Sequence, residues 1–449
     1  MLQVIFLRNL CRLEEKELEK MLPLTLSYRD IPSYNLWTAV IACLFLLLMP
    51  LYASAAPGDT FNATAGTTVT YDSNVFRLSP IVNPAALTGI PTRSDQIIIS
   101  TFALSLNKVY SMQRFEATGS LIDNRYNDFD FLNFLGKNYT AAWHWYATPY
   151  LHGRLSSSHA ESLNNFANLT GFVNSTNRNL RTNDNYRFEG VFEIDRAWHL
   201  IGGLDHRVAK NSRITVQDFS NQVSSAEGGI RYKRPSGASL TYKVRVGAGE
   251  FMNRPEPIVV NLFDNRFHEM EHEVRLLWPV TVKAFIEARG GYLSREHVHF
   301  PQRDFAGFVG DVNLNWAVTP KVRVNASWMR QLSNYQTAPS AFLNTSFQRF
   351  SSSFIATNRF TIAPVWQITE KTALRLRYDY VLSDFEGAVI PQPAGTRSDS
   401  MHSGLIALEW QPLKVLFLSA AFHRDRRRSN LRGFDFDSTA GSISAKLNF

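Results

Sequence analysis

Histidine and serine are the side chains best suited to carry chemistry in this chain, and their spacing argues against catalysis. His402 and Ser403 are adjacent, so on an extended strand their side chains would point to opposite faces. An esterase needs a serine, a histidine and an acid or amide in mutual contact. His297 and His299 could share one face of a loop, but two ligands make only half of a zinc site. We therefore predict no enzymatic activity, no metal site and no cofactor.

Arginine is the second chemically informative residue type, because it supplies 35 of the 47 basic side chains. A guanidinium group binds carboxylates and phosphates through two parallel hydrogen bonds. In segments such as 240–246 and 374–380, charged residues alternate with apolar ones. If the apolar face meets lipid, the charged face lines a water-filled lumen. The basic residues assigned to this lumen are Arg154, Arg187, Arg231, Lys243, Arg245, Arg275, Arg289, Arg323, Arg375 and Arg377.

These lumen residues allow two interpretations. Acidic residues on the same faces, Glu227 and Glu273 among them, would pair with the arginines and complete the inner wall. Alternatively, fixed cations in a confined channel would concentrate anionic solutes. Arg375 and Arg377, together with Lys243 and Arg245, are the strongest candidates for solute contacts.

A further basic group lies near the C-terminus, in the last long polar segment, which we place at residues 424–436. As an extracellular loop it would bind lipopolysaccharide phosphates or an acidic polymer, or it would be a solvated loop without a ligand. The group consists of Arg424, Arg426, Arg427, Arg428 and Arg432.

The elements that position these residues are β-strands, because apolar and polar residues alternate with period two almost everywhere after residue 60. Short turns and long polar segments alternate between the strands, which is typical of outer-membrane barrels. A soluble sandwich would instead need a second sheet over nearly every strand. We predict an all-β fold, an antiparallel transmembrane outer-membrane β-barrel with short periplasmic turns and long extracellular loops. Eighteen strands fit best and sixteen is the alternative count; either width leaves an aqueous channel.

Tryptophans support this arrangement, because six of the nine lie near the predicted short turns. Such a distribution forms an aromatic girdle at one lipid–water interface. The six are Trp145, Trp198, Trp278, Trp316, Trp366 and Trp410. Composition is consistent with a barrel, since 13% of the residues are aromatic and the mean hydropathy is -0.18, too polar for a multi-helix membrane protein.

The N-terminal segment 1–55 is expected to be a signal peptide, leaving 56–449 as the barrel. An apolar run over 36–49 ends in small residues, with Ala53 and Ala55 at the spacing that signal peptidase recognises. A retained membrane anchor is one alternative, and a lipoprotein modified at Cys43 is another. Met21 is a plausible true start, because the segment before it is acidic and too long for a signal peptide. Export would place the protein in the outer membrane of a Gram-negative bacterium.

The C-terminus resembles the signal that barrel-assembly machinery recognises. Phe449 is preceded at alternate positions by Leu447, Ala445 and Ile443. We therefore expect this machinery as a partner, together with outer-membrane lipid and lipopolysaccharide. Nucleic acid is not expected, because an exported barrel does not meet it.

Two segments resemble a known family. Thr70-Tyr-Asp-Ser-Asn-Val-Phe-Arg-Leu-Ser79 opens the barrel, and Arg424-Asp-Arg-Arg-Arg-Ser-Asn430 with Gly433-Phe-Asp-Phe-Asp437 closes it. Together they resemble the outer-membrane barrel proteins of exopolysaccharide operons, the EpsL type, which are grouped with β-barrel porins. The resemblance implies a role in exopolysaccharide biosynthesis or export and supplies no catalytic residues. Within the first segment, Asp72, Asn74 and Arg77 would pin the rim by hydrogen bonds.

The leading hypothesis is a passive pore for an anionic polysaccharide, whose chain makes weak, exchangeable contacts with the lumen arginines. The partners would then include the exopolysaccharide and other proteins of a secretion complex. One alternative is a general diffusion porin for small solutes. Another is a non-conducting outer-membrane scaffold, its lumen closed by loops 157–184 and 331–349.

Overall fold

A single 18-stranded antiparallel sheet makes up most of the computed structural model. The structure describes residues 60–163, 166, 178–212, 220–252, 266–299, 301–334, 352, 354–387 and 395–449, all within the unit Tyr52–Phe449. The predicted signal peptide and its cleavage site at Ala53 and Ala55 lie outside the described residues. Among the described residues, no helix is long and apolar enough to span a membrane.

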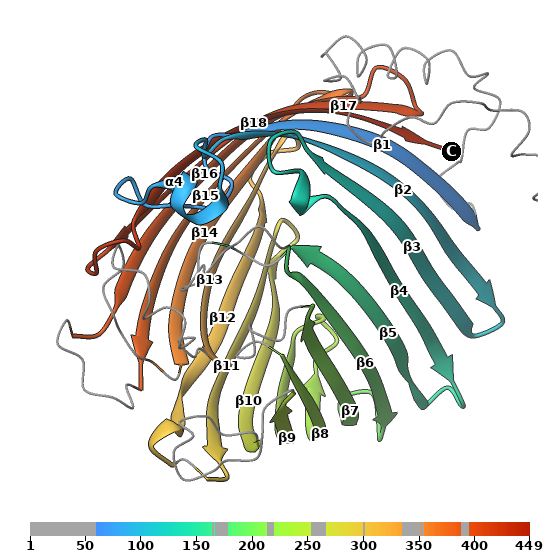
Figure 1. The fold of residues 1–449 in the computed structure, drawn as a ribbon. Helices are drawn as coiled ribbons and strands as arrows, with labels where there is room; N and C mark the ends of the chain where they lie inside the picture. Colours follow the sequence, from blue (N-terminus) through green and yellow to red (C-terminus); the bar gives the residue numbers. More distant parts are fainter. Residues whose placement is uncertain are drawn as a thin grey trace, which may run out of the picture. The chain divides into compact units, whose positions relative to one another are not determined.

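The strands follow one another in chain order around the sheet (Figure 1). The first nine are β1 (Phe61–Asp72), β2 (Asp95–Tyr110), β3 (Gln113–Tyr126), β4 (Phe134–Tyr146), β5 (Leu151–Leu163), β6 (Leu180–Glu193), β7 (Trp198–Asn211), β8 (Asn221–Lys233) and β9 (Ser239–Phe251). The others are β10 (Arg266–Thr281), β11 (Ala284–His297), β12 (Phe305–Ala317), β13 (Val322–Asn334), β14 (Phe354–Thr369), β15 (Thr372–Glu386), β16 (Ser398–Trp410), β17 (Leu416–Ser429) and β18 (Phe436–Asn448). Within the described residues, short helical turns between strands are α4 (Pro84–Thr88), η1 (Asp130–Leu132) and η4 (Pro301–Arg303).

The sheet closes on itself, because β1 pairs with β2 on one side and with β18 on the other. At the end of this β1–β18 ladder, Ala63 N–H donates to Phe449 O at 2.9 Å and Phe449 N–H donates to Ala63 O at 2.8 Å. Closure leaves no strand edge unpaired, which a lipid environment requires. The structure therefore confirms a closed antiparallel barrel of eighteen strands, and the alternative count of sixteen is wrong.

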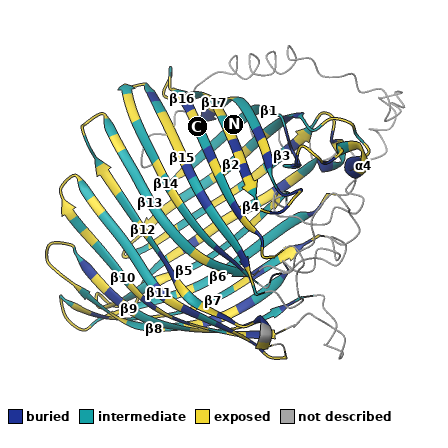
Figure 2. Cartoon of the chain, turned by 90° about the vertical axis from the view of Figure 1, so that its left-hand side faces the viewer, coloured by how far each residue is buried: buried dark blue, intermediate teal, exposed yellow. Residues whose placement is uncertain are grey.

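Exposure along the strands is inverted relative to a soluble protein. On β10, Met270, Val274 and Trp278 are 42%, 45% and 48% exposed, whereas Glu271 and Glu273 are each 5% exposed. Figure 2 shows the same alternation of exposed and less exposed residues along many strands. An outward apolar face and an inward charged face are typical of a transmembrane barrel.

The connections alternate in length, as the sequence predicts. Two-residue turns such as 111–112 and 370–371 occur at one end, and connections as long as 335–353 at the other. Of the six girdle tryptophans, five are exposed at the short-turn end, and Trp145 stacks on Phe188 with ring centroids 5.6 Å apart. Pro279 lies inside β10 beside a bulge, because proline lacks the N–H that a regular ladder needs.

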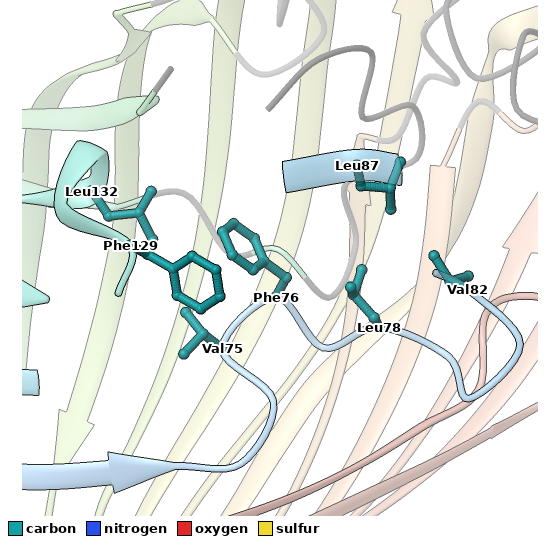
Figure 3. Close-up of a cluster of buried hydrophobic side chains, with 7 residues drawn as sticks. All are labelled: Val75, Phe76, Leu78, Val82, Leu87, Phe129 and Leu132. Carbon is teal, nitrogen blue, oxygen red and sulfur yellow. The ribbon is translucent and has the colours of Figure 1, made fainter. Parts of the chain in front are cut away.

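The connection between β1 and β2 forms a hydrophobic cluster with η1 at the long-connection end (Figure 3). Phe76 and Phe129 meet edge to face, with ring centroids 4.9 Å apart. The cluster consists of Val75, Phe76, Leu78, Val82, Leu87, Phe129 and Leu132. It orders the first long connection of the barrel without any regular element longer than five residues.

Polar contacts fix the start of this connection. The Asp72 carboxylate accepts hydrogen bonds from Asn74 N–H at 2.9 Å and from Ser438 Oγ at 2.8 Å, and pairs with Arg77 at 2.8 Å. Asn74 Nδ2 also donates to the backbone oxygen of Asp437 at 3.0 Å. The structure confirms that these residues pin the rim. It also brings together the two segments on which the family resemblance rests.

Candidate functional site: the charged inner wall

The inward faces of β6 to β12 carry a continuous ladder of ion pairs. Arg187 contacts Glu189 at 2.7 Å and also pairs with Glu227. Glu227 in turn accepts from Lys243 Nζ at 3.0 Å, and Lys243 lies 3.4 Å from Glu273. Because Glu227 and Glu273 each contact basic residues of other strands, the ladder ties the strands together across the wall.

The ladder continues on the next strands. Arg289 contacts Asp311 at 2.7 Å, Glu271 at 3.0 Å and Glu273 at 3.4 Å. Arg245 pairs with Glu271, and Arg275 lies 3.4 Å from Glu273. Five of the ten predicted lumen cations, Arg187, Lys243, Arg245, Arg275 and Arg289, thus belong to one network with carboxylates. For these five, the inner-wall interpretation accounts for the contacts.

Three other predicted cations are less neutralised. Arg231 Nε donates to Thr241 Oγ1 at 3.2 Å. Within the part of the chain that the structure describes, Arg154, Arg231 and Arg323 form no ion pair with a carboxylate. Arg154 and Arg231 line an inward depression of about 340 Å³ that spans β4 to β10. Arg187, Lys243 and Arg275 line the same depression together with Glu189, Glu227 and Glu273, so basic residues outnumber acidic ones there.

The last two predicted cations lie on β15. Arg375 contacts Glu409 at 2.7 Å and Arg377 contacts Asp379 at 2.6 Å. Their side chains remain 50% and 47% exposed. Each has one carboxylate partner and remains about half exposed, so both guanidinium groups are open to a solute in the lumen.

The basic loop expected at residues 424–436 is not a loop over most of its length. Arg424, Arg426, Arg427 and Arg428 lie within β17, and only Arg432 lies in the connection to β18. The strand continues because the period-two pattern does not stop where the apolar residues end: Arg427 is inward and buried, whereas its neighbours in the run are outward and exposed. The correction moves three arginines from a loop to the outer surface of the barrel.

A serine, a histidine and an aspartate meet on the inner face of β16 and β17. Ser403 Oγ lies 2.8 Å from His423 Nε2, and Asp425 Oδ1 lies 3.1 Å from the same nitrogen. In a catalytic relay the acid must hold the opposite ring nitrogen, so this geometry does not activate the serine. Sequence analysis considered Ser403 only with its neighbour His402. The register of β16 and β17 sets Ser403 opposite Asp425. Knowledge of this register would have identified the serine, histidine and aspartate as neighbours.

Of the two histidines considered as metal ligands, His297 ends β11 and His299 follows it in the chain. His297 is buried at the end of β11 and its ring lies 3.3 Å from Asp304. No cluster of three or more metal-ligating side chains occurs among the described residues.

The C-terminal residues lie on β18 or directly after it. Ile443 is 71% exposed on the outward face, and Leu447 lies opposite Leu416. Ala445 and Phe449 complete the strand that meets β1.

Comparison with known proteins gives matches of fold only. No family model matches the chain, and no curated protein matches it. Among solved structures, OccK5 (OpdH) of Pseudomonas aeruginosa is 11% identical with a TM-score of 0.43, covering 87% of this chain and 98% of its own. OccAB3 of Acinetobacter baumannii is 11% identical with a TM-score of 0.44, covering 87% and 99%. The siderophore receptor PirA of P. aeruginosa is 10% identical with a TM-score of 0.39, covering 88% and 81%. The closed antiparallel geometry, with apolar residues outward and charged residues inward, is that of a transmembrane β-barrel.

Proposed function

We propose that this protein is a porin-type channel of the outer membrane of a Gram-negative bacterium, through which small polar solutes diffuse. The observation that carries the proposal is the inverted wall, apolar outside and charged inside, around eighteen closed strands. Barrels of this width leave a water-filled passage. Fixed charges of both signs along the passage hold solutes weakly enough for them to leave again.

In this proposal, the channel selects between anions and cations through the basic side chains that lack a carboxylate partner. The wall of β6 to β12 balances most of its arginines with carboxylates, whereas Arg154, Arg231 and Arg323 form no ion pair within the described residues. Arg375 and Arg377 add half-exposed guanidinium groups. We expect a modest preference for anions over cations.

The experiment is planar-bilayer recording of the purified, folded protein. Steady single-channel conductance, with a reversal potential in a KCl gradient that favours chloride, is the expected result. Arg375→Ala with Arg377→Ala should move the reversal potential toward zero. A folded barrel that stays silent would overturn the channel and leave a non-conducting scaffold as its role.

Export of an anionic exopolysaccharide is a second proposal, and it rests on the resemblance of segments 70–79 and 424–437. Its support is that both segments meet at one rim, where Asn74 donates to the Asp437 backbone and Ser79 donates to Asp435 at 3.0 Å. Gene deletion separates the two proposals. Loss of extracellular polymer with normal solute uptake favours export, and loss of solute uptake with normal polymer favours diffusion.

The C-terminal strand supplies a proposal about assembly. Ile443, Ala445, Leu447 and Phe449 would dock on the barrel-assembly machinery before β18 pairs with β1. Deleting Phe449 removes two backbone hydrogen bonds to Ala63 as well as the terminal aromatic ring, whereas Phe449→Ala removes the ring alone. Equal loss of folded protein in both variants supports recognition of the ring. Normal assembly of Phe449→Ala would contradict it.

A further inference from the structure

We propose that the outer surface of β14 to β17 is a binding site for lipid A, the phosphorylated anchor of lipopolysaccharide. The inference rests on the outer-membrane placement proposed above, but not on what passes through the lumen. Three exposed arginines, Arg424, Arg426 and Arg428, point outward from alternate positions of β17. They lie at the end of the barrel with the long connections, which is the external end in outer-membrane barrels.

Strand register arranges this surface in rows that pass from apolar to cationic. The lowest row sets Leu376 opposite Ile406, and Ile406 opposite Phe422. The middle row joins Tyr378, Gly404 and Arg424. The upper row joins Tyr380, His402 and Arg426. A lipid lying against the barrel would meet apolar side chains with its acyl chains and guanidinium groups with its phosphates.

A groove of about 390 Å³ lies where the rows meet. Its walls include Ile362, Leu376, Tyr378, Ile406 and Phe422, and Arg424 lies at its edge. Gly404 forms part of the groove, and a Cβ added there would meet nothing within 4 Å. The missing side chain therefore leaves an open apolar slot beside Arg424, where part of an acyl chain would pack.

The charges around the site favour an anion. Arg426 lies 3.7 Å from Asp437, and Arg428 lies 4.0 Å from Asp435 and 3.8 Å from Asp437. These pairs are long, and the arginine side chains stay 51% and 46% exposed. Arg424 forms no ion pair among the described residues. Three guanidinium groups thus face two carboxylates, and the His402 ring, stacked on Tyr380 at 4.8 Å, lies opposite Arg426.

The site best fits lipid A that carries both phosphates, because a phosphate accepts two parallel hydrogen bonds from one arginine. Each basic residue near a membrane surface adds about 1 kcal/mol to the attraction of anionic lipid. Removing three should therefore weaken binding roughly a hundredfold.

Native mass spectrometry of the delipidated, refolded barrel with added bisphosphorylated lipid A tests the site. Arg424→Ala/Arg426→Ala/Arg428→Ala should lose roughly a hundredfold in affinity. The charge-matched control Arg125→Ala/Lys137→Ala/Lys210→Ala removes three exposed cations from other strands and should change little. Equal losses in both triple variants would mean general surface electrostatics and would overturn the site.

Two further measurements test the groove and the phosphates. Gly404→Leu should reduce lipid A binding several-fold by filling the slot, whereas Gly228→Leu, equally open and on β8, should not. Unchanged binding to Gly404→Leu would overturn the groove. Monophosphorylated lipid A should bind more weakly than the bisphosphorylated form. Full displacement of lipid A by equimolar inorganic phosphate would overturn the lipid assignment and indicate a site for free phosphate.

Discussion

Two parts of the barrel wall, β6 to β12 and β15 to β16, share the alternation of apolar and charged residues but differ in how their charges are paired. On β6 to β12, arginines and lysine are locked between carboxylates that are nearly excluded from solvent, as with Glu271 and Glu273. On β15 and β16, Arg375 and Arg377 each hold one carboxylate and remain half exposed. The two regions therefore differ in how densely their charges are linked: shared carboxylates join the basic residues of β6 to β12, whereas the two β15 arginines form separate pairs.

The largest expected effect comes from breaking the ladder. Glu273→Ala leaves Lys243, Arg275 and Arg289 without a shared carboxylate, so the free energy of unfolding should fall by about 3 kcal/mol. Glu409→Ala, which leaves only half-exposed Arg375 unpaired, should cost about 0.5 kcal/mol. Urea unfolding of both variants in lipid vesicles measures the two losses. Losses of equal size would show that the two walls do not differ.

A second effect concerns access to the arginines. Phenylglyoxal should modify Arg375 and Arg377 before Arg245 and Arg289, whose side chains are only 22% and 24% exposed and hold carboxylates. Peptide mass spectrometry at successive times gives the order of modification. Early modification of Arg289 would indicate that the ladder opens on the time scale of the reaction.

The smallest effect is expected in a short turn away from both walls. The N–H groups of Trp198 and Ala197 donate to the Asp195 carboxylate at 2.7 Å and lower its pKa. A lowered pKa stabilises the turn above the ordinary aspartate pKa, and this stabilisation is lost as the pH falls through the lowered value. Asp195→Asn should therefore reduce the melting temperature slightly at neutral pH and not at all in strong acid. A larger loss in acid would contradict this assignment.

Strand number and facing could be predicted because period two is a local property of the sequence. The ends of the strands could not be predicted, because β17 continues at the rim with arginine on both of its faces. There, hydropathy no longer distinguishes a strand from a loop. The contact of Ser403 with His423 needed the β16–β17 register. The hydrogen bond from Ser438 to Asp72, 366 positions apart, needed closure of the whole ring. The partition of arginines between ladder and passage needed the neighbours of each side chain, which only the fold supplies.

The seam between β1 and β18 also has a consequence for the time course of folding. Contacts of such long sequence separation close large loops and form slowly. β1 therefore keeps one edge without a partner until β18 has joined the sheet. An exposed edge templates aggregation. On the outer-membrane placement proposed above, we expect that losing holdase chaperones would deplete this protein more than barrels of few strands.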